Sequence, residues 1–282
     1  MPIIAARLRG PAVALLLAFA VAQCGRSPES PTGPSPVLSR GAVPQSGGPP
    51  PAGDSLGTVT ALGATRFMAY GDSITFGTVS SFDGGYLFDS IPGTEYPVQF
   101  DNQLESAFAS QNFTVTNEGV PGEWALQAIT NGRFAQRMAA QRPQALLLLE
   151  GINDLNNDQS VAATVGYLQQ MVELARLYNT TVFIGTMFQT CVSTSPSGQV
   201  RPNAATRING FNSALRAMAA GRQNVHVVDL FAAFGTQNCG PDGGIGILGG
   251  DGLHPNPSGY SIIATQFAAA VRNVFAVRGS YQ

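Results

Sequence analysis

The sequence has no lysine, and charged residues make up only 11% of its 282 positions. Its 15 basic residues are all arginine, and 17 acidic residues leave a formal net charge of −2 at pH 7. Binding to nucleic acid requires an excess of basic residues on one face, so this composition argues against a nucleic-acid partner. The hydrophobic residues, 44% of the chain, exclude a disordered protein and suffice for a sizeable core.

Histidine and cysteine are scarce too, with two histidines and three cysteines in the chain. No histidine or acidic cluster lies near a cysteine in the sequence, so we expect no metal site. The run Asp154-x-Asn156-x-Asp158 begins like a calcium loop, but Gln159 and Val165 occupy the positions that need glycine and glutamate. The glycine-rich run at residues 243–250 lacks the Lys-Ser/Thr pair of a phosphate-binding loop.

The longest apolar run at the N-terminus is too short for a membrane span. Arg7 and Arg9 precede the uncharged stretch Pro11–Ala22, whereas a bilayer-spanning helix needs about 20 apolar residues. A basic start followed by a short apolar run predicts a secretory signal over residues 1–24. We therefore expect an exported protein, either secreted or periplasmic, or anchored to a membrane.

Two kinds of processing fit the end of this signal. Ala20-Val21-Ala22 suits ordinary signal cleavage, which would release a soluble protein. Val21-Ala22-Gln23-Cys24 resembles a bacterial lipobox, in which Cys24 is lipidated, although that family prefers Gly, Ala or Ser where Gln23 stands. Residues 25–58 contain 21 Pro, Gly or Ser, a composition typical of a flexible linker. Such a linker would hold a lipid-anchored domain clear of the membrane.

Cys191 and Cys239 fall in the exported part of the chain, where a disulfide can form. A bridge between them would close a long loop and contribute about 4 kcal/mol in the chain-entropy model. The alternative is a pair of unpaired buried thiols.

Residues 59–282 alternate between two kinds of segment and predict one folded domain. Short, nearly uncharged apolar runs are typical of parallel strands buried on both faces. Amphipathic stretches between them have helical periodicity, so that Met171, for example, is expected in the core. The alternation predicts an α/β fold in which a five-stranded parallel sheet is covered on both faces and binds ligands at the carboxyl ends of its strands. The predicted strands are Arg66–Tyr70, Phe113–Thr116, Ala145–Leu149, Thr181–Thr186 and Val225–Asp229, and the predicted helices are Tyr96–Ser110, Glu123–Ala140, Ser160–Tyr178, Asn203–Ala220 and Pro257–Val277.

Three short motifs follow the first three strands. Ser73, preceded by Gly71-Asp72, is expected on a tight turn at the start of a helix, where backbone N–H groups favour a developing negative charge. Gly119 in Asn117-Glu118-Gly119 could bring a bare N–H close to a reacting atom. Asn153, in Gly151-Ile152-Asn153-Asp154, could donate its side-chain amide to an oxyanion. Taken singly, such residues are more often a helix cap, a glycine turn and a turn asparagine.

A fourth motif follows the fifth strand and distinguishes these alternatives. Asp251 stands three residues before His254, one of the two histidines. An imidazole that takes a proton needs a carboxylate to fix its tautomer and stabilise its charge, and this spacing supplies one within a turn. The other histidine, His226, lies inside a predicted strand and is interpreted as structural.

Together these four motifs resemble the SGNH hydrolase superfamily, also called the GDSL lipase/esterase family. The resemblance covers residues 65–275 and implies a flavodoxin-like three-layer α/β/α sandwich. It implies Ser73 as nucleophile, His254 with Asp251 as the rest of a catalytic triad, and an oxyanion hole formed by Ser73, Gly119 and Asn153. Asp72 and Asp154 would support these residues. It also implies acyl transfer to water on a small-molecule ester without a metal or organic cofactor, and we expect a monomer.

The substrate is less well defined by the sequence. Lipid-like or short-chain acyl esters and acetylated carbohydrates are both compatible with the triad, and a non-catalytic cell-surface binding protein would be the alternative from a different class. Three long loops surround the predicted site: residues 78–95, 188–206 and 232–250. The first, rich in aromatic residues, could form an apolar lid or acyl wall, or an insertion packed on the surface. Trp124 is expected in the core, with a sugar platform as the alternative.

Overall fold

The computed structural model describes residues 59–82, 86–191, 204–235, 238–240 and 243–278. Their centre is a five-stranded sheet with the strand order β5-β2-β6-β7-β8, in which every neighbouring pair is parallel. This arrangement confirms the predicted α/β fold class and strand number. The five strands are β2 (Arg66–Gly71), β5 (Thr114–Gly119), β6 (Ala145–Leu149), β7 (Thr181–Gly185) and β8 (Val225–Val228).

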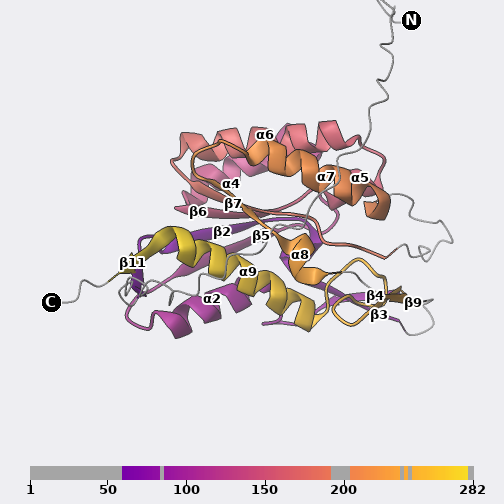
Figure 1. Cartoon of the computed structure of the whole chain (residues 1–282), viewed down its shortest axis with the longest axis horizontal. Helices are drawn as coiled ribbons and strands as arrows, with labels where there is room; N and C mark the ends of the chain where they lie inside the picture. Colours follow the sequence, from indigo (N-terminus) through magenta and orange to yellow (C-terminus); the bar gives the residue numbers. More distant parts are fainter. Residues whose placement is uncertain (1–58, 83–85, 192–203, 236–237, 241–242, 279–282) are drawn as a thin grey trace, which may run out of the picture. The chain divides into compact units, whose positions relative to one another are not determined.

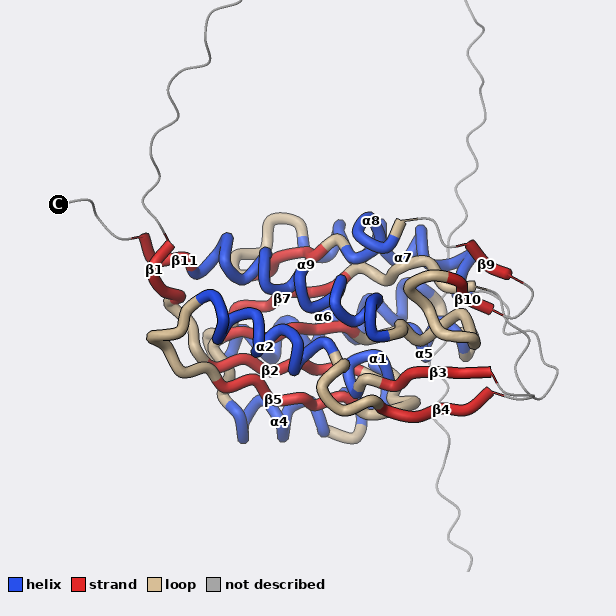
Figure 2. Tube along the Cα trace, turned by 90° about the horizontal axis from the view of Figure 1, so that it is seen from below, coloured by secondary structure: helices blue, strands red, loops and turns tan. Residues whose placement is uncertain are grey.

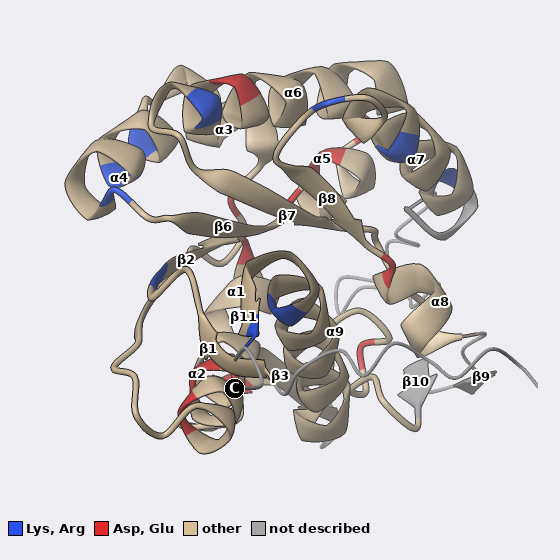
Figure 3. Ribbon diagram, turned by 60° about the vertical axis from the view of Figure 1, so that its left-hand side comes forward, with Lys and Arg blue, Asp and Glu red and all other residues tan. Residues whose placement is uncertain are grey.

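Helices cover both faces of the sheet, which gives three layers (Figures 1 and 3). The helices of one layer are α2 (Tyr96–Ala107) and α9 (Pro257–Phe275), which pack against each other. The opposite layer contains α3 (Ala125–Thr130), α4 (Arg133–Gln141), α5 (Ile152–Asn156), α6 (Val161–Leu177) and α7 (Ala204–Ala219). None of the helices in the described residues is long and apolar enough to cross a membrane.

Local sequence explains these elements. All five residues of β6, Ala-Leu-Leu-Leu-Leu, are buried because the strand lies between two helical layers. The hydroxyl of Ser160 accepts the Ala163 N–H and caps the start of α6. The apolar side of α6, including the fully buried Met171, faces the core as its periodicity predicts.

The structure corrects several predicted boundaries. The helix predicted over Glu123–Ala140 is two helices, α3 and α4, because the chain turns at Asn131-Gly132, where Gly132 has a left-handed backbone with φ of 71°. The strand predicted to end at Thr116 continues to Gly119, which pairs with Gly71 in β2. The sequence Asn117-Glu118-Gly119 is therefore part of the sheet and does not form a turn after it.

The predicted loop at residues 78–95 contains a β-hairpin instead. Strands β3 (Thr78–Phe82) and β4 (Tyr86–Ser90) pair antiparallel and form a sheet separate from the central one. Figure 2 shows them side by side at the same end of the domain as α1 (Ser73–Phe76) and α5. The hairpin thus lies at the carboxyl ends of the parallel strands, where the four motifs were expected.

Further short elements complete the described chain. Strand β1 (Val59–Leu62) pairs antiparallel with β11 (Ala276–Arg278), β9 (Asn238–Gly240) pairs with β10 (Gly243–Ile245), and α8 (Leu230–Phe234) follows β8. The predicted signal, Cys24 and the linker lie outside the described residues, as does much of the predicted 188–206 loop.

Candidate active site

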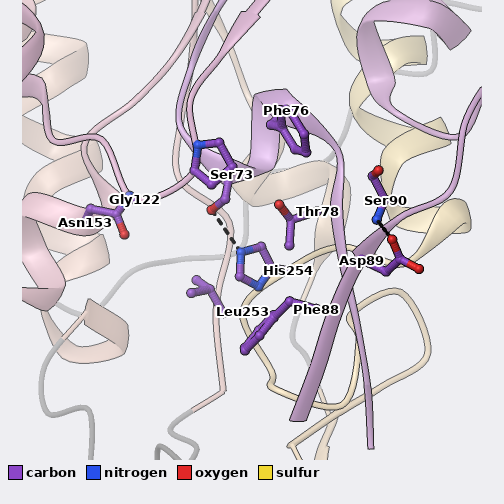
Figure 4. A pocket seen from close by; sticks show the side chains of 11 residues that line it. Ser73, Phe76, Thr78, Phe88, Asp89, Ser90, Gly122, Asn153, Leu253 and His254 are labelled. Carbon is purple, nitrogen blue, oxygen red and sulfur yellow. Dashed lines mark hydrogen bonds between the residues drawn. The ribbon is translucent and has the colours of Figure 1, made fainter.

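Ser73 stands at the first position of α1, directly after β2. Asp72 caps this helix, because its Oδ1 accepts the Ile74 N–H at 2.8 Å. The cap places the Ser73 side chain at the carboxyl edge of the sheet, where Figure 4 shows it facing His254. Only 7% of the Ser73 surface is exposed, so its hydroxyl is largely shielded from bulk water.

Three of the predicted residues form a continuous hydrogen-bonded series. Ser73 Oγ lies 2.9 Å from His254 Nε2, and His254 Nδ1 lies 2.5 Å from Asp251 Oδ2. The residues come from opposite ends of the domain sequence, 181 positions apart for Ser73 and His254, and meet because β2 and the segment before α9 end at the same sheet edge. This geometry permits proton transfer from a hydroxyl to an imidazole that a carboxylate orients.

The Asp251 carboxylate is buried but well supplied with donors. Burial by itself would raise its pKa, yet hydrogen bonds from His254, Ser80 and the Leu253 N–H, together with the nearby imidazole, hold the pKa below its ordinary value. The side chain therefore remains ionised in the neutral range. An ionised Asp251 can stabilise positive charge on His254.

Asn153, at the second position of α5, lines the same cavity as Ser73 and His254. Its Nδ2 donates to the backbone carbonyl of Glu123 at 2.9 Å, which fixes the orientation of the amide. The Glu123 side chain is held in turn by an ion pair with Arg133 and by the Tyr70 hydroxyl at 3.1 Å. The amide is thereby anchored to a buried network behind the cavity.

Asp154 does not reach the cavity and supports its wall instead. Its two carboxylate oxygens accept the N–H groups of Ala125 at 2.7 Å and Leu126 at 3.2 Å, at the start of α3. Burial raises the pKa of Asp154, and these hydrogen bonds oppose the rise. The residue therefore links the Asn153 segment to the start of α3.

Gly119 is placed differently from the sequence prediction. Its N–H donates to Asn117 Oδ1 at 2.9 Å, and the residue is absent from the cavity lining. A Cβ at Gly119 would lie 2.1 Å from Phe76 N, so the glycine permits β5 to approach the backbone of α1. Gly122, which the sequence motifs did not mark as a site residue, lines the cavity together with Asn153 and His254 (Figure 4).

Two further carboxyl groups are buried beneath the site. Burial raises the pKa of Asp72 to about 7, and one of its oxygens, Oδ2, has no hydrogen-bond partner among the described residues. Burial, followed by the charges of Asp72, Glu123 and Asp154, raises the pKa of Glu150 well above its ordinary value. The raised pKa values mean that the floor of the site carries less negative charge than its composition suggests.

The cavity at Ser73 has a volume of about 480 Å³, within the range of small-molecule pockets. The surface of its lining is mostly apolar. Among the lining residues that the structure describes, Asp89 is acidic and none is an arginine. Figure 3 shows arginines on α4 and α7, two helices of the layer opposite α2 and α9. The residues that line the cavity are Ser73, Phe76, Thr78, Phe88, Asp89, Ser90, Pro121, Gly122, Asn153, Leu253 and His254.

The other residues noted in the sequence lie outside the cavity lining. Cys191 is buried and its N–H donates to Gly252 O at 2.7 Å, next to Asp251. The Cys239 side chain is outside the described residues, so the disulfide stays a prediction. His226, away from the cavity, stacks on Phe183 with ring centroids 5.2 Å apart. Trp124 is half-buried and not fully in the core. The described residues contain no group of three or more His, Cys, Asp or Glu arranged to hold a metal ion.

Comparison with known proteins identifies the family. Residues 69–262, which include all the residues of the hydrogen-bonded series, match the GDSL-like lipase/acylhydrolase family. The chain belongs to this family. Its resemblance to SGNH hydrolases, first suggested by four short motifs, is thereby confirmed, and the protein is placed among hydrolytic enzymes. A comparison with curated protein sequences finds no match.

Solved structures share the fold at low sequence identity. The aryl esterase of M. smegmatis has a TM-score of 0.61 and 14% identity, over 75% of this chain and 100% of that one. Est24, a carbohydrate acetylesterase from Sinorhizobium meliloti, has a TM-score of 0.60 and 12% identity, over 75% and 100%. A lipolytic G-D-S-L protein from Veillonella parvula has a TM-score of 0.53 and 21% identity, over 72% and 96%.

Proposed function

We propose that the protein is a serine-dependent carboxylic ester hydrolase that acts through an acyl-enzyme. The observation that carries this proposal is the hydrogen-bonded series from Ser73 through His254 to Asp251 at the edge of a cavity. His254 Nε2 takes the hydroxyl proton as Ser73 Oγ attacks the ester carbonyl. Asp251 keeps the imidazole in the right tautomer and stabilises its positive charge. His254 then returns the proton to the leaving alcohol.

The second half of the reaction uses the same groups. A water molecule takes the place of the alcohol, loses a proton to His254 and attacks the acyl group on Ser73. The bond between Ser73 Oγ and the acyl carbon breaks, and Oγ regains its proton from the imidazolium. The carboxylic acid leaves, and these steps need no redox partner or added cofactor.

The oxyanion formed in each half of the reaction needs hydrogen-bond donors. We assign these donors to the backbone N–H groups of Ser73 and Gly122 and to Asn153 Nδ2. Gly122 replaces Gly119 in this assignment because the Gly119 N–H is already bonded to Asn117 and lies outside the cavity lining. The Asn153 amide, oriented by the Glu123 carbonyl, retains a second N–H that can donate to the oxyanion.

The cavity favours an uncharged acyl or aryl ester as the substrate. Phe76 and Phe88, which are 43% and 49% exposed, present aromatic surface to it, and Leu253 and Pro121 add aliphatic surface. Burial of an apolar acyl group against these side chains supplies binding energy in proportion to the area removed from water. None of the described lining residues is an arginine, so they offer no favourable site for an anionic ester.

An acetylated carbohydrate is the second candidate substrate. Asp89 and Ser90 lie at the same cavity and offer a carboxylate and a hydroxyl to sugar hydroxyl groups. Among structures with this fold, Est24 bears the description of a carbohydrate acetylesterase. The same triad would remove an acetyl group from a sugar by the same steps.

The test is hydrolysis of p-nitrophenyl esters of increasing acyl length and of acetylated oligosaccharide, by protein that lacks residues 1–24 and by its Ser73→Ala variant. We expect turnover by the wild type and almost none by the variant, with the substrate profile deciding between acyl esters and sugar acetates. Activity that survives in Ser73→Ala would contradict the mechanism. The absence of turnover on every ester would favour a binding protein on the same scaffold.

We also propose that the protein is exported, with Cys24 as its point of lipidation or with a soluble N-terminus after Ala22. The basic and apolar pattern of the first residues and the linker composition support export. The mass of the mature N-terminal peptide from a secreting host distinguishes a diacylated cysteine from free Gln23. An uncleaved N-terminus would contradict both forms of processing.

A further inference from the structure

The hairpin of β3 and β4 turns one of its faces toward the candidate triad. Ser80 in β3 is paired directly with Phe88 in β4, so the two side chains project from the same face of the hairpin. Ser80 contacts Asp251, and the Phe88 ring meets the His254 ring edge to face with centroids 5.6 Å apart. One register pair of the hairpin therefore touches both the carboxylate and the imidazole.

The Ser80 hydroxyl has a defined hydrogen-bond direction. Ser80 Oγ lies 2.6 Å from Asp251 Oδ1 and also accepts the backbone N–H of Asp251 at 3.2 Å. Because an ionised carboxylate can only accept, the hydroxyl proton must point to Oδ1. Oδ1 accepts two more hydrogen bonds, from the N–H groups of Leu253 and His254 at 3.1 Å each, while Oδ2 faces the imidazole.

A glycine and two hydrogen bonds to backbone carbonyls hold the hairpin close to the segment that carries Asp251. A Cβ at Gly249 would lie 2.4 Å from Ser80 Oγ and 2.7 Å from Ser80 O, so glycine is needed for the close approach. The Gly250 N–H donates to Ser80 O at 3.3 Å. At the start of the hairpin, the buried Tyr260 hydroxyl of α9 donates to Thr78 O at 2.5 Å. The hairpin is thus fastened to the segment that carries Asp251 and His254.

We infer that Ser80 is a positioning residue for the triad, which fixes the Asp251 carboxylate so that Oδ2 stays aligned with His254. The inference rests on the proposed function, since it concerns the same reaction. Ser80 touches neither substrate nor nucleophile and acts through Asp251. Through Ser80, the β3–β4 hairpin positions the triad as well as lining the cavity.

The experiment compares Ser80→Ala with Ser81→Ala on the best p-nitrophenyl ester. Ser81 is the matched control because it is the next residue of β3, is exposed, and projects from the opposite face. We expect Ser80→Ala to lower kcat by about 10- to 100-fold, the factor associated with a hydrogen bond to a charged group, with little change in KM. Ser81→Ala should retain the wild-type kcat.

A double-mutant cycle separates positioning from a general loss of structure. In an Asp251→Ala background the hydroxyl has no carboxylate to hold, so Ser80→Ala should cause no further loss of kcat. The rate at which an organophosphorus ester labels Ser73 should follow the same pattern. An unchanged kcat in Ser80→Ala, or an equal loss in both backgrounds, would overturn the inference and leave the proposed function intact. Failure of the wild type to hydrolyse any ester would overturn the proposed function itself.

Discussion

Replacement of Gly119 by alanine tests whether the approach of β5 to α1 sets the position of the nucleophile. The added Cβ would lie 2.1 Å from Phe76 N, 2.6 Å from Phe76 Cα and 2.6 Å from Thr75 C. All three are backbone atoms, which no rotamer change can move. Ordinary contact begins at 3.4 Å, so strand and helix must separate by more than 1 Å at this point.

A separation of β5 from α1 would displace the nucleophile, because Ser73 lies on α1. Ser73 begins this helix, and its hydroxyl must remain within hydrogen-bond reach of His254, now 2.9 Å away. A misplacement of about 1 Å between reacting groups can cost on the order of 10²-fold in rate, and overpacking costs about 1–3 kcal/mol of stability. We expect Gly119→Ala to lower kcat by about 100-fold and to lower Tm.

The assay is ester hydrolysis under saturating substrate, with thermal unfolding measured on the same samples. The control is Gly166→Ala in α6, where the new Cβ meets nothing within 4 Å. Because glycine weakens a helix interior, that substitution should leave kcat unchanged and stabilise the protein by about 0.5–1 kcal/mol. A Gly119→Ala variant with wild-type kcat and Tm would refute the reasoning.

Three further predictions concern other parts of the site. Burial raises the pKa of Asp72 from 3.8 to about 7, so protonated Asp72 contributes stability that is lost as the pH rises from about 4 to about 7. Asp72→Asn, which keeps an acceptor for the Ile74 N–H, should flatten the decrease of Tm between about pH 4 and about pH 7, and an unaltered pH dependence would contradict this. Asn153→Ala should lower kcat by about 10²–10³, as loss of an oxyanion donor does, and an effect on KM alone would argue against that role. Peptide mapping without reductant should recover Cys191 linked to Cys239, and two freely alkylated thiols would exclude the bridge.

The parallel sheet was predictable because its strands are encoded locally. A run such as Ala145–Leu149 is apolar at every position, which suits only a strand covered on both faces or a buried helix, and its length excludes the helix. The meeting of Ser73, His254 and Asp251 was predictable for a related reason. Parallel strands end at one edge, so motifs that follow them, such as those of Ser73 and His254, meet there despite their separation in sequence.

Features that depend on tertiary contacts were not predictable in this way. The contact between Ser80 and Asp251 joins residues 171 positions apart, and a serine in an exposed-looking loop carries no local sign of it. The aromatic residues of that loop left open a wall near the site or an insertion packed on the surface, and did not indicate a hairpin with paired register. Gly119 and Gly122 stand three residues apart in one glycine-containing segment, and only the continuation of β5 decides which of them faces the cavity.

The most direct test of the central claim is the site of covalent labelling by an organophosphorus ester. The wild type is incubated with diethyl p-nitrophenyl phosphate, and labelled peptides are mapped while residual ester hydrolysis is followed. We predict a single adduct on Ser73, loss of activity in proportion to its formation, and greatly slowed labelling in His254→Ala. An adduct at another residue, or full activity in fully labelled protein, would contradict the account.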